Sequence, residues 1–269
     1  MFLPGLTRVS QEQPPPDIIA LTIPCSGEKT MRLICRMLCV VVVSGLVTGK
    51  CQAQAPAAAS EDTGRSIAGG GISVPGWQGT VDDGAAKAGQ TIKDAKLAPE
   101  GAGMRVTTGP AITYWNPKNM AKGDYTVSAT FNEPKFMNLN THPHPYGIVI
   151  AGNDLGTPQQ SLLYCGAYGN GTFIVRGFGP DPFQMGGKRP TANDAVHKAP
   201  AVGEPVTQTI AMSVKGDKVS CSINGTVVAT YDKSEVVAAG KLKSTDGVYG
   251  IRFAHNTDAV VTDLKITKP

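Results

Sequence analysis

The sequence has little charge and few aromatic residues. Of its 269 residues 17% are charged and 6% are aromatic, and the formal net charge is +4. Nucleic-acid-binding tails are built from blocks of about five or six like charges, and the chain contains no such block. The composition therefore argues against nucleic acid as a partner.

Long apolar runs are also missing, with one short exception near the N-terminus. Met31–Arg36 is a basic lead, Met37–Val47 is apolar, and small residues suited to cleavage follow. This order is typical of a signal peptide, and the run is shorter than the roughly 20 apolar residues of a membrane span. We predict that residues 1–30 are a mis-assigned extension and that 31–53 are a signal peptide. The protein would then be exported, to the periplasm or the extracellular space.

Cysteine is scarce in the part that would remain after cleavage. The chain has six cysteines, of which Cys165 and Cys221 lie beyond residue 53. An exported protein could pair these two in a disulfide. However, Cys221 alternates in step with Val219 and Ile223, as a buried free thiol would. We favour two buried thiols, with the disulfide as the alternative.

Turn-forming residues are plentiful: 32 glycines and 20 prolines punctuate short runs of period-two alternation. In Tyr125–Phe131 the odd positions are apolar and the even positions polar. Two other such runs meet at Asn224-Gly225, a dipeptide that tolerates the positive φ angles of a tight hairpin. Only Asp232–Leu242 has the composition of a short helix. We therefore predict an all-β fold, a two-sheet antiparallel sandwich.

The expected strands share this alternation and are bounded by glycine, proline or asparagine. They are Met104–Thr107, Ala111–Tyr114, Tyr125–Phe131, Tyr146–Ala151, Leu162–Tyr168, Thr172–Phe178, Thr209–Lys215, Lys218–Ile223, Val227–Tyr231, Val248–His255 and Ala259–Thr267. Between Pro180 and Pro205 we expect a long loop, because five prolines occur there. Residues 54–75 are predicted to be a flexible leader, and 76–269 to be the folded domain.

The C-terminal strands carry a family resemblance. After Asn224-Gly225, the segments "GVYGIR" (Gly247–Arg252) and "VVTDLKI" (Val260–Ile266) resemble the closing strands of concanavalin A-like, laminin-G-like jelly rolls. The chain is most similar to bacterial exported domains of the 3-keto-disaccharide hydrolase-like kind. The resemblance implies a jelly roll with a carbohydrate-facing sheet, and a glycan as partner.

Whether the chain is an enzyme stays open at this point. Retaining glycanases of this fold (family 16 glycoside hydrolases) carry an E-x-D-x-x-E strand, which holds two carboxylates about 5 Å apart. The chain has no such pattern, so we expect a glycan-binding domain without a catalytic carboxylate pair. The alternatives are a hydrolase or lyase acting on a 3-keto or related sugar through a His or Tyr base, and a laminin-G-like adhesion module.

The densest chemical cluster is "THPHPY", Thr141–Tyr146. His142 and His144 are two residues apart, so in an extended segment they point the same way and could share a metal ion. A third ligand would have to come from elsewhere, such as His255 or Asp154. We favour the simpler interpretation, a proline-stiffened loop whose histidines are solvated or hydrogen-bonded.

Calcium is a further candidate cofactor. Asp82 and Asp83 are adjacent acids, and acidic loop residues hold Ca²⁺ in many lectin-like sandwiches. A solvated turn explains the same two residues more simply.

Residues on outward strand positions are better candidates for ligand recognition. Tyrosine rings stack on apolar sugar faces, and guanidinium groups donate paired hydrogen bonds to hydroxyl or carboxylate oxygens. The alternative is that each is an ordinary outward strand residue. The predicted ligand-binding residues on such positions are Tyr164, Tyr168, Arg176 and Arg252, and His144 and Tyr146 of the "THPHPY" segment are predicted to join them.

Overall fold

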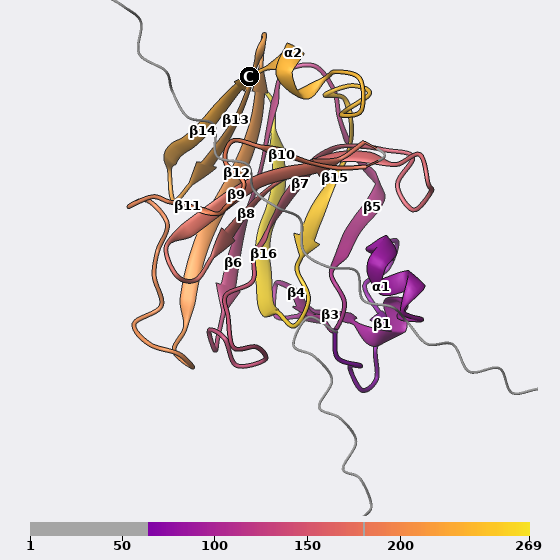
Figure 1. The fold of residues 1–269 in the computed structure, drawn as a ribbon, viewed down its shortest axis with the longest axis vertical. Helices are drawn as coiled ribbons and strands as arrows, with labels where there is room; N and C mark the ends of the chain where they lie inside the picture. Colours follow the sequence, from indigo (N-terminus) through magenta and orange to yellow (C-terminus); the bar gives the residue numbers. More distant parts are fainter. Residues whose placement is uncertain (1–63, 180) are drawn as a thin grey trace, which may run out of the picture. The chain divides into compact units, whose positions relative to one another are not determined.

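The computed structural model describes residues 64–179 and 181–269. The predicted N-terminal extension, the signal peptide and the first part of the leader lie outside these residues. The described chain forms two β-sheets that pack face to face (Figure 1). This confirms the predicted all-β, two-sheet jelly-roll sandwich.

The first sheet contains the hairpin that turns at Asn224-Gly225. In spatial order its strands are β1 (Gly71–Ile72), β3 (Lys96–Glu100), β4 (Gly103–Thr107), β16 (Asp258–Thr267), β6 (Tyr125–Glu133), β12 (Val206–Lys215), β13 (Lys218–Ile223) and β14 (Thr226–Asp232). Its neighbours pair antiparallel except β1 and β3, which are parallel.

The second sheet carries the candidate site. In spatial order its strands are β10 (Pro182–Met185), β9 (Thr172–Phe178), β8 (Ser161–Tyr168), β7 (Tyr146–Asn153), β15 (Gly247–Phe253), β5 (Ile112–Ala121) and β2 (Gln78–Val81), and β11 (Thr191–Ala192) pairs with β9. The helices are short: α1 (Asp83–Lys87), the 3₁₀ turn η1 (Ile92–Asp94) and α2 (Lys233–Val236). In this part of the chain, no helix is long and apolar enough to cross a bilayer.

Period-two alternation places the core as predicted. In β6 the apolar positions are buried and the polar ones half-buried, except Glu133 at the end of the strand, which is buried. On the neighbouring β12, Ile210, Met212 and Val214 are buried in the same way, and Met212 pairs across the sheet with Val127. Burying a side chain of this size stabilises the fold by about 1.5–3 kcal/mol, so the alternation fixes which face of each strand points inward.

The two inward cysteines form a disulfide. Cys165 on β8 is bonded to Cys221 on β13, with their Cα atoms 6.2 Å apart. The prediction of two buried free thiols is therefore wrong, although the inward orientation of Cys221 is correct. Parity identifies which face a residue occupies but not its partner across the core, and these two are 56 residues apart in sequence. The bond joins the two sheets through the core.

The Asn224-Gly225 hairpin also anchors a loop. Both residues have positive φ, 50° and 85°, as the dipeptide predicts. The Asn224 side chain accepts a hydrogen bond from the Thr209 backbone N–H and donates to the Ala195 carbonyl and to Gln208 Oε1, each at 2.8 Å. One side chain thus ties the turn to β12 and to the loop after β11.

The sandwich begins earlier than the sequence predicts. Part of the predicted leader forms β1, whose Gly71 N–H donates to the Ala95 carbonyl at 2.7 Å. The close approach needs glycine, because a Cβ at Gly70 would lie 1.9 Å from the Lys93 carbonyl oxygen. Likewise, the predicted long loop after Pro180 contains β10 and β11. These short strands at or near sheet edges are too brief to show alternation.

Candidate functional site

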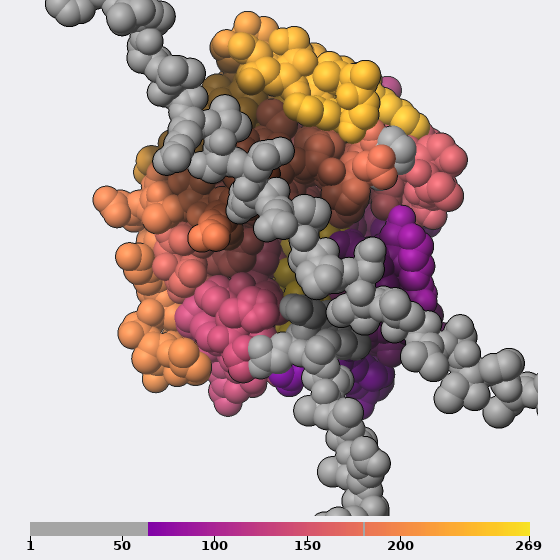
Figure 2. Space-filling model, viewed as in Figure 1, coloured from indigo at the N-terminus to yellow at the C-terminus, as the bar shows by residue number. Residues whose placement is uncertain are grey.

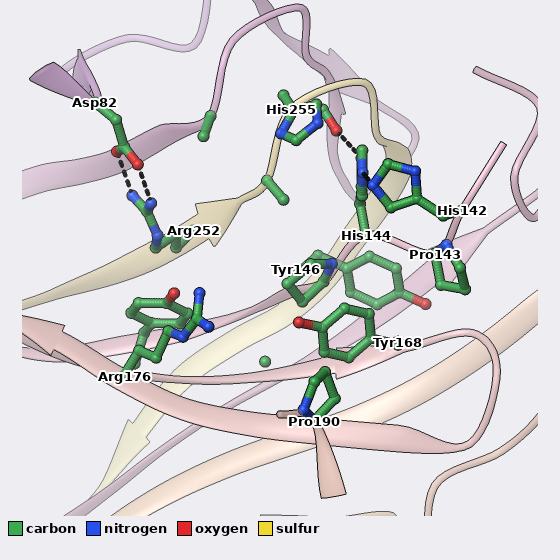
Figure 3. A pocket seen from close by; sticks show the side chains of 15 residues that line it. Asp82, His142, Pro143, His144, Tyr146, Tyr168, Arg176, Pro190, Arg252 and His255 are labelled. Carbon is green, nitrogen blue, oxygen red and sulfur yellow. Dashed lines mark hydrogen bonds and ion pairs between the residues drawn. The ribbon is translucent and has the colours of Figure 1, made fainter. Parts of the chain in front are cut away.

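A cavity of about 400 Å³ opens on the outer face of the second sheet (Figure 3). Strands β8, β9 and β15 supply its floor, and the segment before β7 and the residues after β15 supply one side. All six predicted ligand-binding residues line it: Tyr164, Tyr168, Arg176, Arg252, His144 and Tyr146. The structure thus brings them together, whereas their binding role stays a prediction.

Two glycines help to open the cavity. Arg252 pairs across the sheet with Gly147, which pairs in turn with Gly166. Neither glycine adds a side chain of its own to this face, and a Cβ at Gly166 would lie 3.2 Å from the Pro145 side chain. The strand register places Gly147 beside Gly166, and the missing side chains leave room for the cavity.

Arg252 is held from every side. Its Nη1 and Nη2 donate to Asp82 Oδ1 and Oδ2 at 2.8 and 2.5 Å, and Nη1 also donates to Thr113 Oγ1 at 3.0 Å. The guanidinium carbon lies 4.9 Å from the ring centroids of both Tyr164 and Phe178. Burial acts to lower the pKa of Arg252, but the Asp82 carboxylate outweighs it and the pKa is raised. Arg252 is therefore a permanent cation whose charge is offset within the protein.

Arg176 and Tyr168 are the polar groups best placed for a ligand. Tyr164 pairs directly across the sheet with Arg176, whose Nε donates to Gln184 Oε1 at 3.0 Å. Burial raises the pKa of Tyr168 to about 12, aided by Tyr164 and opposed by Arg176. Tyr168 is consequently neutral at physiological pH, and its hydroxyl can both donate and accept hydrogen bonds.

Tyr146 belongs mainly to the core. It is 1% exposed and its ring stacks on Phe131 at a centroid distance of 5.5 Å. Burial, followed by the neighbouring Glu133, raises its pKa well above the ordinary value. Burial also raises the pKa of Glu133 to about 7, against a hydrogen bond donated by the Met137 N–H that lowers it. Tyr146 therefore forms a wall of the cavity, and neither residue presents a base to it.

Three histidines gather at one side of the cavity (Figure 3). His142 Nε2 and His144 Nε2 are 2.7 Å apart, and His144 Nδ1 lies 2.5 Å from the His255 carbonyl oxygen. The rings of His144 and His255 are 3.9 Å apart at their centroids. The proposed loop of hydrogen-bonded histidines is thus present, and His255 joins it, whereas Asp154 forms an ion pair with Lys243.

The segment that carries two of these histidines lies between β6 and β7. It forms part of the surface at the end of the sandwich opposite α2 (Figure 2). His255 follows β15, so the three imidazoles come from two loops that the sequence separates by about a hundred residues. Sequence reasoning named His255 only as one of two possible partners, because nothing local indicates which loops meet.

The two acids proposed for calcium do not fit that ion. Calcium is held by roughly six to eight oxygen ligands. Both carboxylate oxygens of Asp82 are hydrogen-bonded to Arg252, and Asp83 is the exposed first residue of α1. Asp82 therefore forms the ion pair with Arg252, and Asp83 begins a helix.

The described lining of the cavity holds a single carboxylate, that of Asp82. Glycoside hydrolysis by the usual route needs two carboxyl groups, one acid and one base or nucleophile. Because Asp82 is committed to Arg252, this lining does not supply them.

Comparisons with known proteins support no identification. The sequence matches no protein-family model, and it matches no curated protein. Among solved structures, it is similar to the carbohydrate binding module CBM66 from Bacillus subtilis, with 10% identity over 73% of this chain and 98% of that one and a TM-score of 0.47. It is also similar to a B. subtilis protein of unknown function with a galectin-like fold (14% identity, 71% and 89% coverage, TM-score 0.49). A third similar structure is the VIP36 exoplasmic/lumenal domain in a Ca²⁺/Man-bound form, with 10% identity over 73% of this chain and 84% of that one and a TM-score of 0.44.

Proposed function

We propose that the protein is exported and binds a carbohydrate in the cavity over β8, without hydrolysing it. The observation that carries this proposal is the convergence of two tyrosines and an arginine, Tyr164, Tyr168 and Arg176, on one cavity. Its volume of about 400 Å³ lies in the range of about 300–1,000 Å³ typical of small-molecule sites. The disulfide supports export, because disulfides persist in oxidising compartments.

The chemistry of the lining suits a sugar. A pyranose ring has an apolar face that can lie against a tyrosine ring, and hydroxyls at its edge that need hydrogen-bond partners. The neutral Tyr168 hydroxyl supplies one such partner. Arg176 supplies another, and among the described residues its hydrogen-bond partner is the uncharged Gln184. The positive charge of Arg176 favours a sugar that carries a carboxylate or another anionic group.

Glycan-array screening of the full chain, followed by calorimetric titration of the best glycan, tests this proposal. Tyr168→Ala should weaken binding about fivefold or more, since an aromatic contact of this kind contributes about 1 kcal/mol beyond its buried area. Tyr231→Ala is the matched control, because Tyr231 lies on β14 in the other sheet. Equal affinity of the two variants, or no glycan bound at all, would refute the proposal.

One observation favours a catalytic alternative. The His142–His144 pair lies beside the cavity, and imidazole can exchange protons near neutral pH. A lyase or hydrolase acting on a 3-keto sugar would use such a base. Turnover of a 3-keto-glucoside that disappears in His142→Ala would support it, whereas binding without turnover supports the lectin-like function. Repeating the titration with calcium chloride and with a chelator distinguishes these two functions from a calcium-dependent adhesion module, whose binding would require calcium.

A further inference from the structure

We propose that His142, His144 and His255 form a binding site for one Zn²⁺ ion at the side of the cavity. Each histidine offers one ring nitrogen, and the three nitrogens lie within 4.8 Å of one another. This site is inferred from the imidazole geometry alone. It would exist whether or not the cavity binds a sugar.

The hydrogen bonds of His144 set its protonation in the way a metal ligand requires. Its Nδ1 lies 2.5 Å from the His255 carbonyl oxygen. The same Nδ1 also lies 3.3 Å from Asn140 Nδ2, a longer contact. A carbonyl can only accept, so we assign the proton to Nδ1 on the shorter contact, and Nε2 of the neutral ring then presents its lone pair. That lone pair faces His142 Nε2 at 2.7 Å. Metal-ligating histidines are usually oriented by this kind of second hydrogen bond to a backbone carbonyl.

The backbone holds the two loops together before any ion binds. Pro143 and Pro145 restrict the chain on both sides of His144. The Ala254 N–H, next to His255, donates to the Pro145 carbonyl at 2.9 Å. Asn140 Nδ2 donates to the Asn256 carbonyl at 2.7 Å. The residues flanking His255 on both sides are therefore fixed to the segment that carries His142 and His144.

The donor set excludes calcium and suits zinc, one of several transition metals that imidazole binds. Three imidazole nitrogens suit zinc, whereas calcium requires oxygen ligands. Tetrahedral zinc with Zn–N bonds of about 2.0–2.1 Å places its ligand nitrogens about 3.3 Å apart. The Nε2 atoms of His142 and His144, 2.7 Å apart, would have to separate by about 0.6 Å. The three nitrogens lie within 4.8 Å of one another, so the widest pair would have to close by up to about 1.5 Å. Three protein ligands leave a fourth position for water or a ligand.

Calorimetric titration of the full, chelator-treated chain with zinc chloride tests the site. The protein should carry no polyhistidine tag, and its free thiols should be alkylated, since four cysteines besides the bonded pair could bind zinc. We expect one zinc per chain and a rise in melting temperature. His142→Ala and His255→Ala should each weaken zinc binding at least tenfold. The matched control is His197→Ala, which removes the fourth histidine of the chain.

Cobalt provides a second readout, which reports the coordination geometry. Co²⁺ in a tetrahedral nitrogen site gives an intense visible absorption, which should appear in the wild type and in His197→Ala and be absent from His142→Ala. Far-ultraviolet circular dichroism confirms that the variants are folded. The proposal is wrong if the wild type takes up no zinc, or if its affinity is unchanged in both His142→Ala and His255→Ala. Failure to bind any glycan leaves this result unaffected.

Discussion

Reduction of the Cys165–Cys221 disulfide should destabilise the protein strongly. The bond closes a loop of 56 residues. The chain-entropy relation for a loop of that length gives about 14 cal/mol/K, or about 4 kcal/mol at 25 °C, because the linked unfolded chain has fewer conformations. With a urea m value of about 2.5 kcal/mol/M, the unfolding midpoint should fall by about 1.5 M.

The assay is urea unfolding followed by tryptophan fluorescence, on protein refolded with and without reductant. Cys165→Ala/Cys221→Ala is the control: its midpoint should be low and insensitive to reductant. Equal midpoints for oxidised and reduced wild type would refute the entropic argument. Alkylation of Cys165 and Cys221 without prior reduction, seen by peptide mapping, would refute the bond itself.

Two further predictions concern buried polar groups. The pKa of Glu133 is raised from 4.5 to about 7 in the folded state. Protonated Glu133 therefore contributes its full stabilisation of the fold below about pH 4.5, and this stabilisation is lost as the pH rises through 7. The free energy of unfolding should fall by about 3 kcal/mol over this interval. Glu133→Gln should flatten the pH dependence of the melting temperature over this interval, and parallel profiles would contradict the assignment. Asn224→Ala removes three hydrogen bonds at a positive φ and should cost about 2–4 kcal/mol in urea unfolding. Asn170 is the control, because its side-chain hydrogen bonds stay within its own turn. Asn170→Ala should lower the free energy of unfolding by about 1 kcal/mol. If the two substitutions lower it equally, the bonds from Asn224 to the distant loop contribute nothing to stability.

Much of the fold follows from the sequence because alternation is a local property. Thr172–Phe178 and Lys218–Ile223 coincide with β9 and β13 to the residue. The missed elements lack that signal: β1 has two residues and β10 begins at a proline on a sheet edge. Their strand conformation depends on partners that are distant in sequence.

The candidate site is predictable only in part, for the same reason. Parity correctly separates Tyr164 and Tyr168 from the inward Cys165. It does not show that Arg252, also an outward residue, is covered by Tyr164 and Phe178 and paired with Asp82, because these partners come from other strands and loops. A solvent-facing position on one strand becomes a buried one when long side chains from its neighbours lie across it.

Strand β8 connects the stability of the sandwich to the candidate site. Its inner face carries Cys165 of the disulfide, and its outer face carries Tyr164 and Tyr168; all its residues are buried. A ligand would therefore contact tyrosine rings that are already fixed, so these side chains would lose little conformational entropy on binding. The same arrangement means that replacing Arg252 or Tyr164 would change folding and binding together. Arg176 is only half-buried and is hydrogen-bonded to one neutral partner, so it is the position where loss of affinity reports most directly on the ligand itself.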